Sequence, residues 1–251
     1  MSHLHLSFCY YNSFQETDFL YYQGLAEVLN AYVTQKEADG ALKPKKIEIE
    51  IACIPAINAG PIVAVSQSRE SYDVTVAQTR KPDLRQLVRI LSYFGSKRWR
   101  SFCCYDWGKN DTASRSFDRI LDREVGEPDM SFFDGRQQVV FQRDELRVIY
   151  EADHLFYELA GQRLDLPPAD PVPVKIGDRY LLGSEGTIVV YEKGTEVQRK
   201  SIPCQPEMPI STRVYARWVN VDAFCNRKML SYSYERNRFY DVKIPPGGRV
   251  P

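Results

Sequence analysis

The feature that most constrains the fold is a proline-rich segment at residues 164–173, LDLPPADPVP. Proline has a fixed φ and no backbone N–H, so this segment cannot continue a helix or the ladder of a central strand. Before it, helical and strand-like periodicities alternate. After it, short strand-like runs are broken by turn residues about every 8–12 residues, as in a small barrel or sandwich. The sequence therefore predicts an α+β domain over residues 1–165 and a mainly β domain over residues 166–251, packed as one compact unit.

The first part mixes two apolar periodicities. Alternation predicts strands at residues 4–11, 45–54, 61–65, 72–77, 99–107, 137–142 and 146–150. Spacings of three and four predict helices at residues 17–38, 84–95, 113–125 and 153–160, and Thr17 or Asp18 is the expected cap of the first helix. We therefore expect an antiparallel or mixed sheet with two to three helices on one face.

The second part contains only strand-like runs. They cover residues 174–182, 187–192, 197–202, 212–220, 229–234 and 240–244. Three prolines and two glycines in the tail, residues 245–251, cannot continue a ladder and predict an extended end. We expect this part to form a small all-β barrel or sandwich packed against the first.

Charge and targeting signals limit the possible functions of the chain. Lys and Arg together number 33 and so do Asp and Glu, so the whole chain has no long-range field that would steer it to nucleic acid. Residues 166–251 hold 13 basic and 9 acidic residues, which places any basic surface in the second part. The N-terminal residues show no secretory signal pattern, and no apolar run approaches about 18 residues. We expect a cytoplasmic protein with no membrane partner.

The catalytic inventory is short. The chain has three histidines, two of them within the first five residues, which leaves His154 as a general acid or base. On the predicted helix, Glu158 would lie one turn from His154 and could pair with it. The sequence contains no H-E-x-x-H, no G-x-S-x-G and no glycine-rich phosphate loop, and its six cysteines form no C-x-x-C pair. We therefore expect no cofactor and no metal site, and a non-enzymatic role is favoured over an enzymatic one.

The second part also holds a repeated aromatic and basic pattern. Alternation places three such residues on one face of the predicted strand 212–220, and the pattern recurs near residue 234. Tyr and Arg dominate the energetics of protein interfaces, because they bury large areas and supply several donors. The predicted binding residues are Arg213, Tyr215, Arg217, Tyr232, Tyr234 and Arg236.

These observations favour a non-enzymatic interaction factor, of immunity or adaptor type, that binds a protein partner through this Tyr/Arg-rich β face. A first alternative is a self-assembling structural protein, such as a lattice or capsid component. A second is a nucleic-acid-binding protein or a hydrolase that uses the His154 region. The neutral charge makes nucleic acid a less favoured partner than protein or a second copy.

Overall fold

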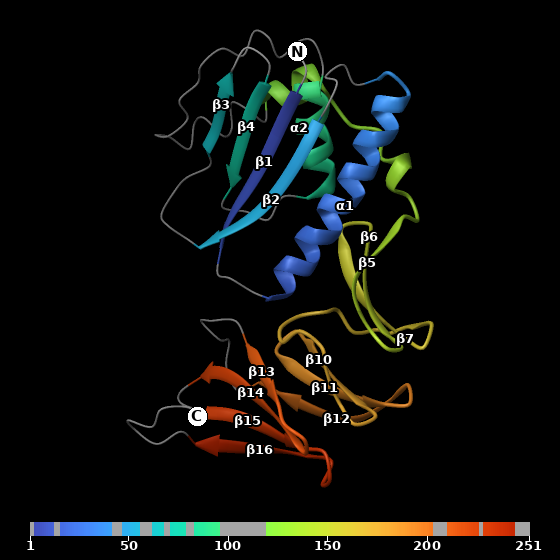
Figure 1. Ribbon diagram of the computed structural model, residues 1–251, viewed down its shortest axis with the longest axis vertical. Helices are drawn as coiled ribbons and strands as arrows, with labels where there is room; N and C mark the ends of the chain where they lie inside the picture. Colours follow the sequence, from blue (N-terminus) through green and yellow to red (C-terminus); the bar gives the residue numbers. More distant parts are fainter. Residues whose placement is uncertain are drawn as a thin grey trace. The chain divides into compact units, whose positions relative to one another are not determined.

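The computed structural model describes residues 3–12, 16–41, 47–55, 62–67, 71–78, 83–95, 119–202, 210–225 and 228–243. The chain is a mixed α+β protein rich in sheet (Figure 1). It divides into two compact units. The first comprises Met1–Asn12, Tyr22–Gln138 and Tyr150–His154, and the second comprises Ser13–Tyr21, Val139–Ile149 and Leu155–Pro251. The domain boundary at residues 165/166 stays a prediction.

The first unit contains a mixed sheet of four strands in the order β2-β1-β4-β3. Its strands are β1 (His3–Asn12), β2 (Ile47–Pro55), β3 (Ile62–Gln67) and β4 (Ser71–Gln78). β1 runs parallel to β2 and to β4, and β3 alone is antiparallel to its neighbour. The antiparallel expectation is therefore wrong for three of these strands, and the mixed alternative holds. The reason is the 23-residue helix between β1 and β2, which at about 1.5 Å per residue can carry the chain back along the full length of a strand.

Helix α1 (Glu16–Ala38) buries one face and ends at a glycine. The buried side chains recur at the three- and four-residue spacing of a helical stripe, and they are Tyr21, Tyr22, Leu25, Val28, Leu29, Tyr32 and Val33. At the C-terminus, Gly40 has φ +68°, its N–H donates to the Glu37 carbonyl, and the Ala41 N–H donates to the Lys36 carbonyl. This is a Schellman motif, and it confirms that the helix ends where the sequence predicts.

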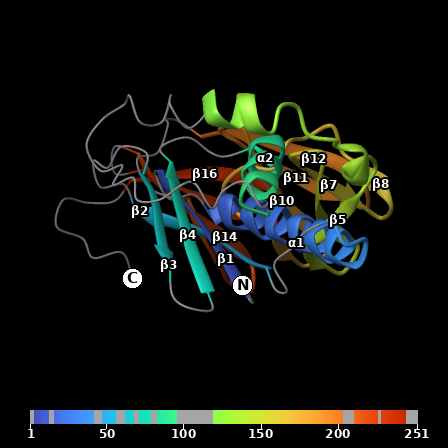
Figure 2. The same cartoon turned by 90° about the horizontal axis from the view of Figure 1, so that it is seen from above.

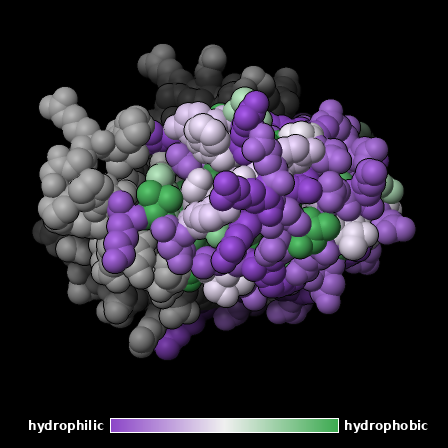
Figure 3. All heavy atoms as spheres, turned by 90° about the horizontal axis from the view of Figure 1, so that it is seen from below, coloured by the Kyte–Doolittle hydropathy of each residue, from purple (hydrophilic) through white to green (hydrophobic). Residues whose placement is uncertain are grey.

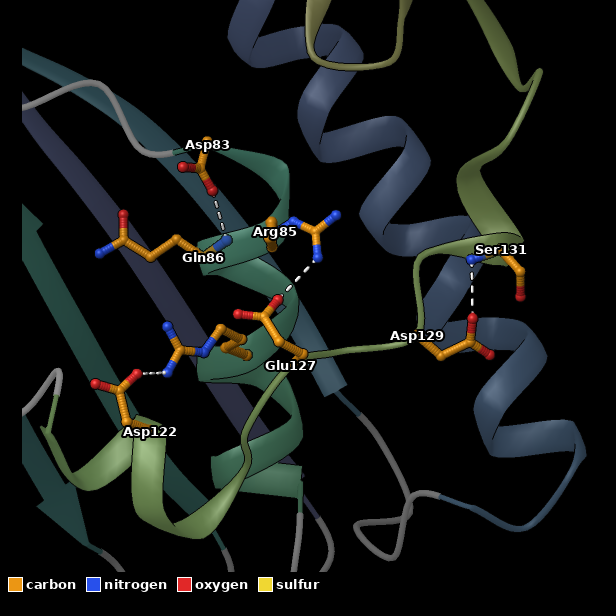
Figure 4. A network of polar contacts seen from close by, with 8 residues as sticks. Asp83, Arg85, Gln86, Asp122, Glu127, Asp129 and Ser131 are labelled. Atoms are coloured by element: carbon orange, nitrogen blue, oxygen red, sulfur yellow. Dashed lines mark hydrogen bonds and ion pairs between the residues drawn. The ribbon is translucent and has the colours of Figure 1, made fainter.

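Helix α2 (Leu84–Gly95) lies beside α1 (Figure 2). Asp83 caps it, because the Asp83 carboxylate accepts a hydrogen bond of 2.6 Å from the Gln86 N–H. On its exposed side, Arg85 pairs with Glu127 at 2.9 Å and Arg89 pairs with Asp122 at 2.5 Å (Figure 4). These ion pairs tie α2 to the segment that follows residue 119, of which residues 119–124 are helical. We therefore assign this polar network a structural role.

A small sheet of four strands follows a 3-10 turn at Ser131–Phe133, in the order β5-β6-β7-β8. Its strands are β5 (Gln137–Arg143), β6 (Leu146–Glu151), β7 (His154–Leu159) and β8 (Gln162–Arg163). The helix predicted for residues 153–160 is wrong, because β7 occupies these residues. Ala152 and Asp153 both have positive φ, 47° and 69°, which makes the tight turn of a β-hairpin where the sequence predicts the start of a helix.

The second unit contains two further four-stranded antiparallel sheets. One has the order β12-β11-β10-β9, from β9 (Val174–Ile176), β10 (Arg179–Ser184), β11 (Thr187–Glu192) and β12 (Thr195–Ser201). The other has the order β13-β14-β15-β16, from β13 (Ser211–Val214), β14 (Trp218–Cys225), β15 (Lys228–Ser233) and β16 (Arg238–Lys243). Both sheets contribute to one apolar core, which includes Leu181, Ile188 and Val190 from the first and Val219, Val221 and Leu230 from the second.

Two strands predicted for the second part are each a hairpin. The predicted strand 174–182 turns at residues 177–178, and the predicted strand 212–220 turns at residues 215–217. In the second of these segments, the alternation of Val214, Ala216 and Trp218 continues through the turn, so the pattern alone could not reveal the reversal of the chain there. In the first turn Gly177 has φ +61°, which a residue with a side chain rarely adopts.

The proline-rich segment packs against β10. The Ala169 N–H donates to the Gly183 carbonyl at 3.0 Å, and the same carbonyl accepts a hydrogen bond of 2.9 Å from the buried Tyr157 hydroxyl. The Asp170 carboxylate accepts bonds of 2.9 Å and 3.0 Å from the N–H and the hydroxyl of Thr17. A residue 153 positions away therefore caps the first turn of α1, where a negative charge is favourable. Thr17 donates hydrogen bonds to the capping residue, whereas the sequence predicts that Thr17 or Asp18 is the capping residue.

Three predictions lie outside the described residues: the strand at 99–107, the first part of the helix at 113–125 and the extended tail at 245–251. Within the described ranges, the structure has no helix long and apolar enough to cross a membrane.

Candidate protein-binding surface

The candidate site is the turn between β13 and β14, which we call the 214–218 turn. Val214 pairs with Val219 at the end of the two strands, and the Tyr215 N–H donates to the Trp218 carbonyl at 2.8 Å. Next to the turn, the Tyr234 N–H donates to the Arg217 carbonyl at 3.0 Å. One main-chain hydrogen bond therefore closes the turn, and another joins it to the turn that follows β15.

Large apolar side chains are exposed at this turn. Val214, Tyr215 and Trp218 are 48%, 38% and 46% exposed, and they are three of the six large hydrophobic residues that are exposed in the described part of the chain. The rings of Tyr215 and Trp218 lie 5.5 Å apart at an interplanar angle of 34°. On the face seen in Figure 3, the described residues are mostly hydrophilic and the hydrophobic ones form small separate patches.

Charged side chains surround the turn. The Arg217 guanidinium lies 3.2 Å from the Glu235 carboxylate, and both side chains are more than half exposed. Arg213 and Arg236 are also exposed, and contact with Tyr240 raises the pKa of the Arg236 guanidinium. Three arginines therefore accompany one glutamate, which gives the surroundings of the turn a positive balance.

Arg179, at the start of β10, contacts Tyr232 and Tyr234, the residue whose N–H bonds the 214–218 turn. Its side chain is 14% exposed, and one guanidinium nitrogen donates to the Tyr232 hydroxyl at 3.0 Å and to the Tyr234 carbonyl at 2.7 Å. Its Nε lies 3.3 Å from a Glu192 carboxylate oxygen, an ion-pair distance. Arg179 thus links the sheet that contains β10 to the turn between β15 and β16.

Tyr234 belongs to the turn between β15 and β16, and it contacts the 214–218 turn and the turn between β9 and β10. Its ring faces the Arg179 guanidinium at 4.7 Å, and its hydroxyl donates to the Asp178 carboxylate at 2.7 Å. This bond lowers the pKa of Asp178 and raises the pKa of Tyr234. The ring lies against Gly177, where an added Cβ would be 2.6 Å from the nearest ring atom. Gly177 therefore leaves the space in which the Tyr234 ring packs.

The structure separates the six predicted binding residues by exposure. Arg213, Tyr215, Arg217 and Arg236 are exposed, and Tyr234 is half-buried. Tyr232 is fully buried in the core, and its hydroxyl donates to the Asn237 side chain at 2.8 Å. Burial raises the pKa of the Tyr232 hydroxyl. The expectation that Tyr232 lies on a binding face is therefore wrong, because its side of β15 faces the core.

Trp218 is an exposed aromatic residue that the sequence reasoning missed. Alternation along one continuous strand placed Trp218 on the face opposite Tyr215. The hairpin brings the two rings together instead. The sequence did hold a signal for this turn. Ala216 and Arg217, a small and a polar residue that suit a turn, lie between the aromatic residues Tyr215 and Trp218.

The catalytic candidates are not brought together. His154 and Glu158 lie in β7, where four residues span about 13 Å along a strand. His154 is exposed, and the Glu158 carboxylate lies 3.3 Å from Arg147, so its charge is already paired. The helical pairing of these two residues is therefore wrong.

Within the described ranges, no group of three or more His, Cys, Asp or Glu side chains is arranged to hold a metal ion. In comparisons with known proteins, no family model matches the chain and no curated protein matches it significantly in sequence.

Proposed function

We propose that this chain is a non-catalytic protein-interaction factor, of adaptor or immunity type, and that the 214–218 turn is its contact surface. The observation that carries the proposal is the exposure of Val214, Tyr215 and Trp218 within five residues. Exposed apolar residues that occur singly are ordinary, but a cluster of large apolar side chains with a polar rim is typical of an interaction site.

The geometry of the turn suits tight binding. The rings of Tyr215 and Trp218 already pack against each other, with their centroids 5.5 Å apart, so the two side chains lose little freedom when a partner covers them. The main-chain bond between them, Tyr215 N–H to the Trp218 carbonyl, limits the freedom of the backbone as well. Rigid aromatic residues on a short turn are effective anchors, because they bury a large area at a low cost in entropy.

The charges define the partner's chemistry. Arg213, Arg217 and Arg236 outnumber Glu235 around the apolar residues. We infer a protein partner with an apolar pocket and acidic residues at its rim. Complementary rim charges mainly raise the association rate, so binding should weaken as salt rises.

The test is capture from lysate of the native host with the full chain as bait, analysed by quantitative mass spectrometry. We compare the unmodified chain with the double variant Tyr215→Ala/Trp218→Ala. Phe19→Ala is the matched control, because Phe19 is an aromatic residue of similar exposure, 48%, on α1. The proposal requires a protein that the wild type and Phe19→Ala both retain and that the double variant loses. If the same proteins bind all three baits, the turn is not the contact surface.

A second copy of the chain is the alternative occupant of the turn. Analytical ultracentrifugation over a wide concentration range distinguishes the two cases. A monomer at all concentrations agrees with a different protein as partner, whereas an oligomer that Trp218→Ala dissociates would assign the turn to self-association.

A further inference from the structure

The arrangement behind the 214–218 turn carries an inference that rests on the proposed function and deepens it. Arg217, Tyr234 and Arg179 form a continuous series of hydrogen bonds. The Arg217 carbonyl accepts from the Tyr234 N–H at 3.0 Å, and the Tyr234 carbonyl accepts from the Arg179 guanidinium at 2.7 Å. The conformation of the turn is thus connected to a side chain on the other sheet.

Two further groups hold the Arg179 guanidinium. The core residue Tyr232 accepts a hydrogen bond of 3.0 Å from the nitrogen that also bonds the Tyr234 carbonyl, and a Glu192 carboxylate oxygen lies 3.3 Å from Nε. A planar guanidinium that is 14% exposed and held by three groups has few alternative positions. It can therefore transmit the position of β10 to the Tyr234 carbonyl.

We propose that Arg179 and Tyr234 are positioning residues that hold the 214–218 turn in the conformation that presents Tyr215 and Trp218. Arg179 is mostly buried, and the half-buried Tyr234 side chain is directed to Asp178 and Gly177. Without Arg179, the β15–β16 turn loses its link to β10, and the bond from Tyr234 to Arg217 opens more often.

Amide hydrogen exchange, followed by NMR on the full chain, tests this proposal without any partner. The informative amides are those of Tyr215 and Tyr234, which donate to Trp218 and Arg217. In Arg179→Ala we expect their protection to fall at least tenfold, while the amides of Val189 and Val190 in β11 keep theirs. Arg199→Ala is the control for the loss of an arginine–glutamate ion pair in the same sheet, because Arg199 pairs with Glu196 within β12 and its side chain is more exposed, at 49%.

Arg179→Lys provides a second variant if Arg179→Ala does not fold. It keeps the charge but lacks the planar fork, so its protection at Tyr215 and Tyr234 should lie between wild type and Arg179→Ala. Protection that is unchanged at these amides in a folded Arg179 variant overturns the proposal. So does a loss that is equal at every protected amide, because that result shows a general loss of stability.

The two proposals fail separately. If Tyr215→Ala/Trp218→Ala leaves partner capture intact, the contact surface is wrong, and the exchange experiment still decides whether Arg179 positions the turn. If this double variant abolishes capture while protection in Arg179→Ala is unchanged, the surface is supported and the positioning role is refuted.

Discussion

Replacement of Gly183 by Ala tests how the proline-rich segment packs on β10. A Cβ at this position would lie 2.3 Å from the Ala169 carbonyl oxygen and 2.5 Å from main-chain atoms of Asp170 and Pro171. Ordinary contact begins at 3.4 Å, so the segment would have to move by about 1 Å. The 3.0 Å bond from the Ala169 N–H to Gly183 would then exceed hydrogen-bond length.

The expected cost follows from these two effects. Loss of one hydrogen bond costs about 1 kcal/mol, and overpacking of a well-packed site costs about 1–3 kcal/mol. We therefore predict that Gly183→Ala lowers the free energy of unfolding by about 3 kcal/mol, measured by urea-induced unfolding. In a protein of this size the Tm should fall by about 6–12 °C.

Gly186→Ala is the matched control for this substitution. Gly186 has φ +75° and no neighbour within 4 Å of an added Cβ, so its replacement costs only the unfavourable backbone conformation, about 1 kcal/mol. Tyr157→Phe, which removes the other bond to the Gly183 carbonyl, should cost about 1 kcal/mol. A Gly183→Ala variant no less stable than Gly186→Ala would refute the reasoning.

Two further predictions concern carboxylates. Asp170→Ala leaves the N–H and hydroxyl of Thr17 without their acceptor, so it should lower the free energy of unfolding by about 2 kcal/mol. Asp170→Asn should have an intermediate stability. If Asp170→Ala and wild type were equally stable in urea, Asp170 would not be the cap. The hydrogen bond from the Tyr234 hydroxyl holds the pKa of Asp178 below its ordinary value. The contribution of this bond to the stability of the fold is therefore present above the unfolded-state pKa of Asp178, and it is lost as pH falls through the folded-state pKa. NMR titration should show the midpoint of Asp178 rise in Tyr234→Phe, and an unchanged midpoint would argue against this bond.

Much of the secondary structure was predictable from local pattern. The sequence correctly predicts α1, α2 and the strands of the first sheet, because the apolar residues of each segment recur at a regular spacing. The β6–β7 turn was not predictable in this way, since Ala152 and Asp153 adopt positive φ without the Gly or Asn that usually signals it. The helix between β1 and β2 allows these two strands to pair in parallel, but the pairing of β1 with β4 depends on long-range contacts that no local pattern encodes.

The candidate surface was predictable only in part. Composition indicated an aromatic and basic region in the second part, and Tyr215 and Arg217 do lie on the exposed turn. The hairpin at this turn places Trp218 outside beside Tyr215, and the position of Tyr232 in β15 places its side chain in the core. The role of Arg179 depends on a contact between residues 55 positions apart, which sequence periodicity does not report.

The most direct test of the central claim is the affinity of the captured partner for the single variant Trp218→Ala, measured by calorimetry on the purified pair. Trp218 is 46% exposed, which for a side chain of about 250 Å² leaves about 115 Å² for a partner to cover. At about 25 cal/mol per Å² this area corresponds to about 3 kcal/mol, or a loss of affinity of about 100-fold. Our account predicts a loss of at least about tenfold for Trp218→Ala and none for Phe19→Ala. Equal affinities of the two variants and the wild type would contradict it.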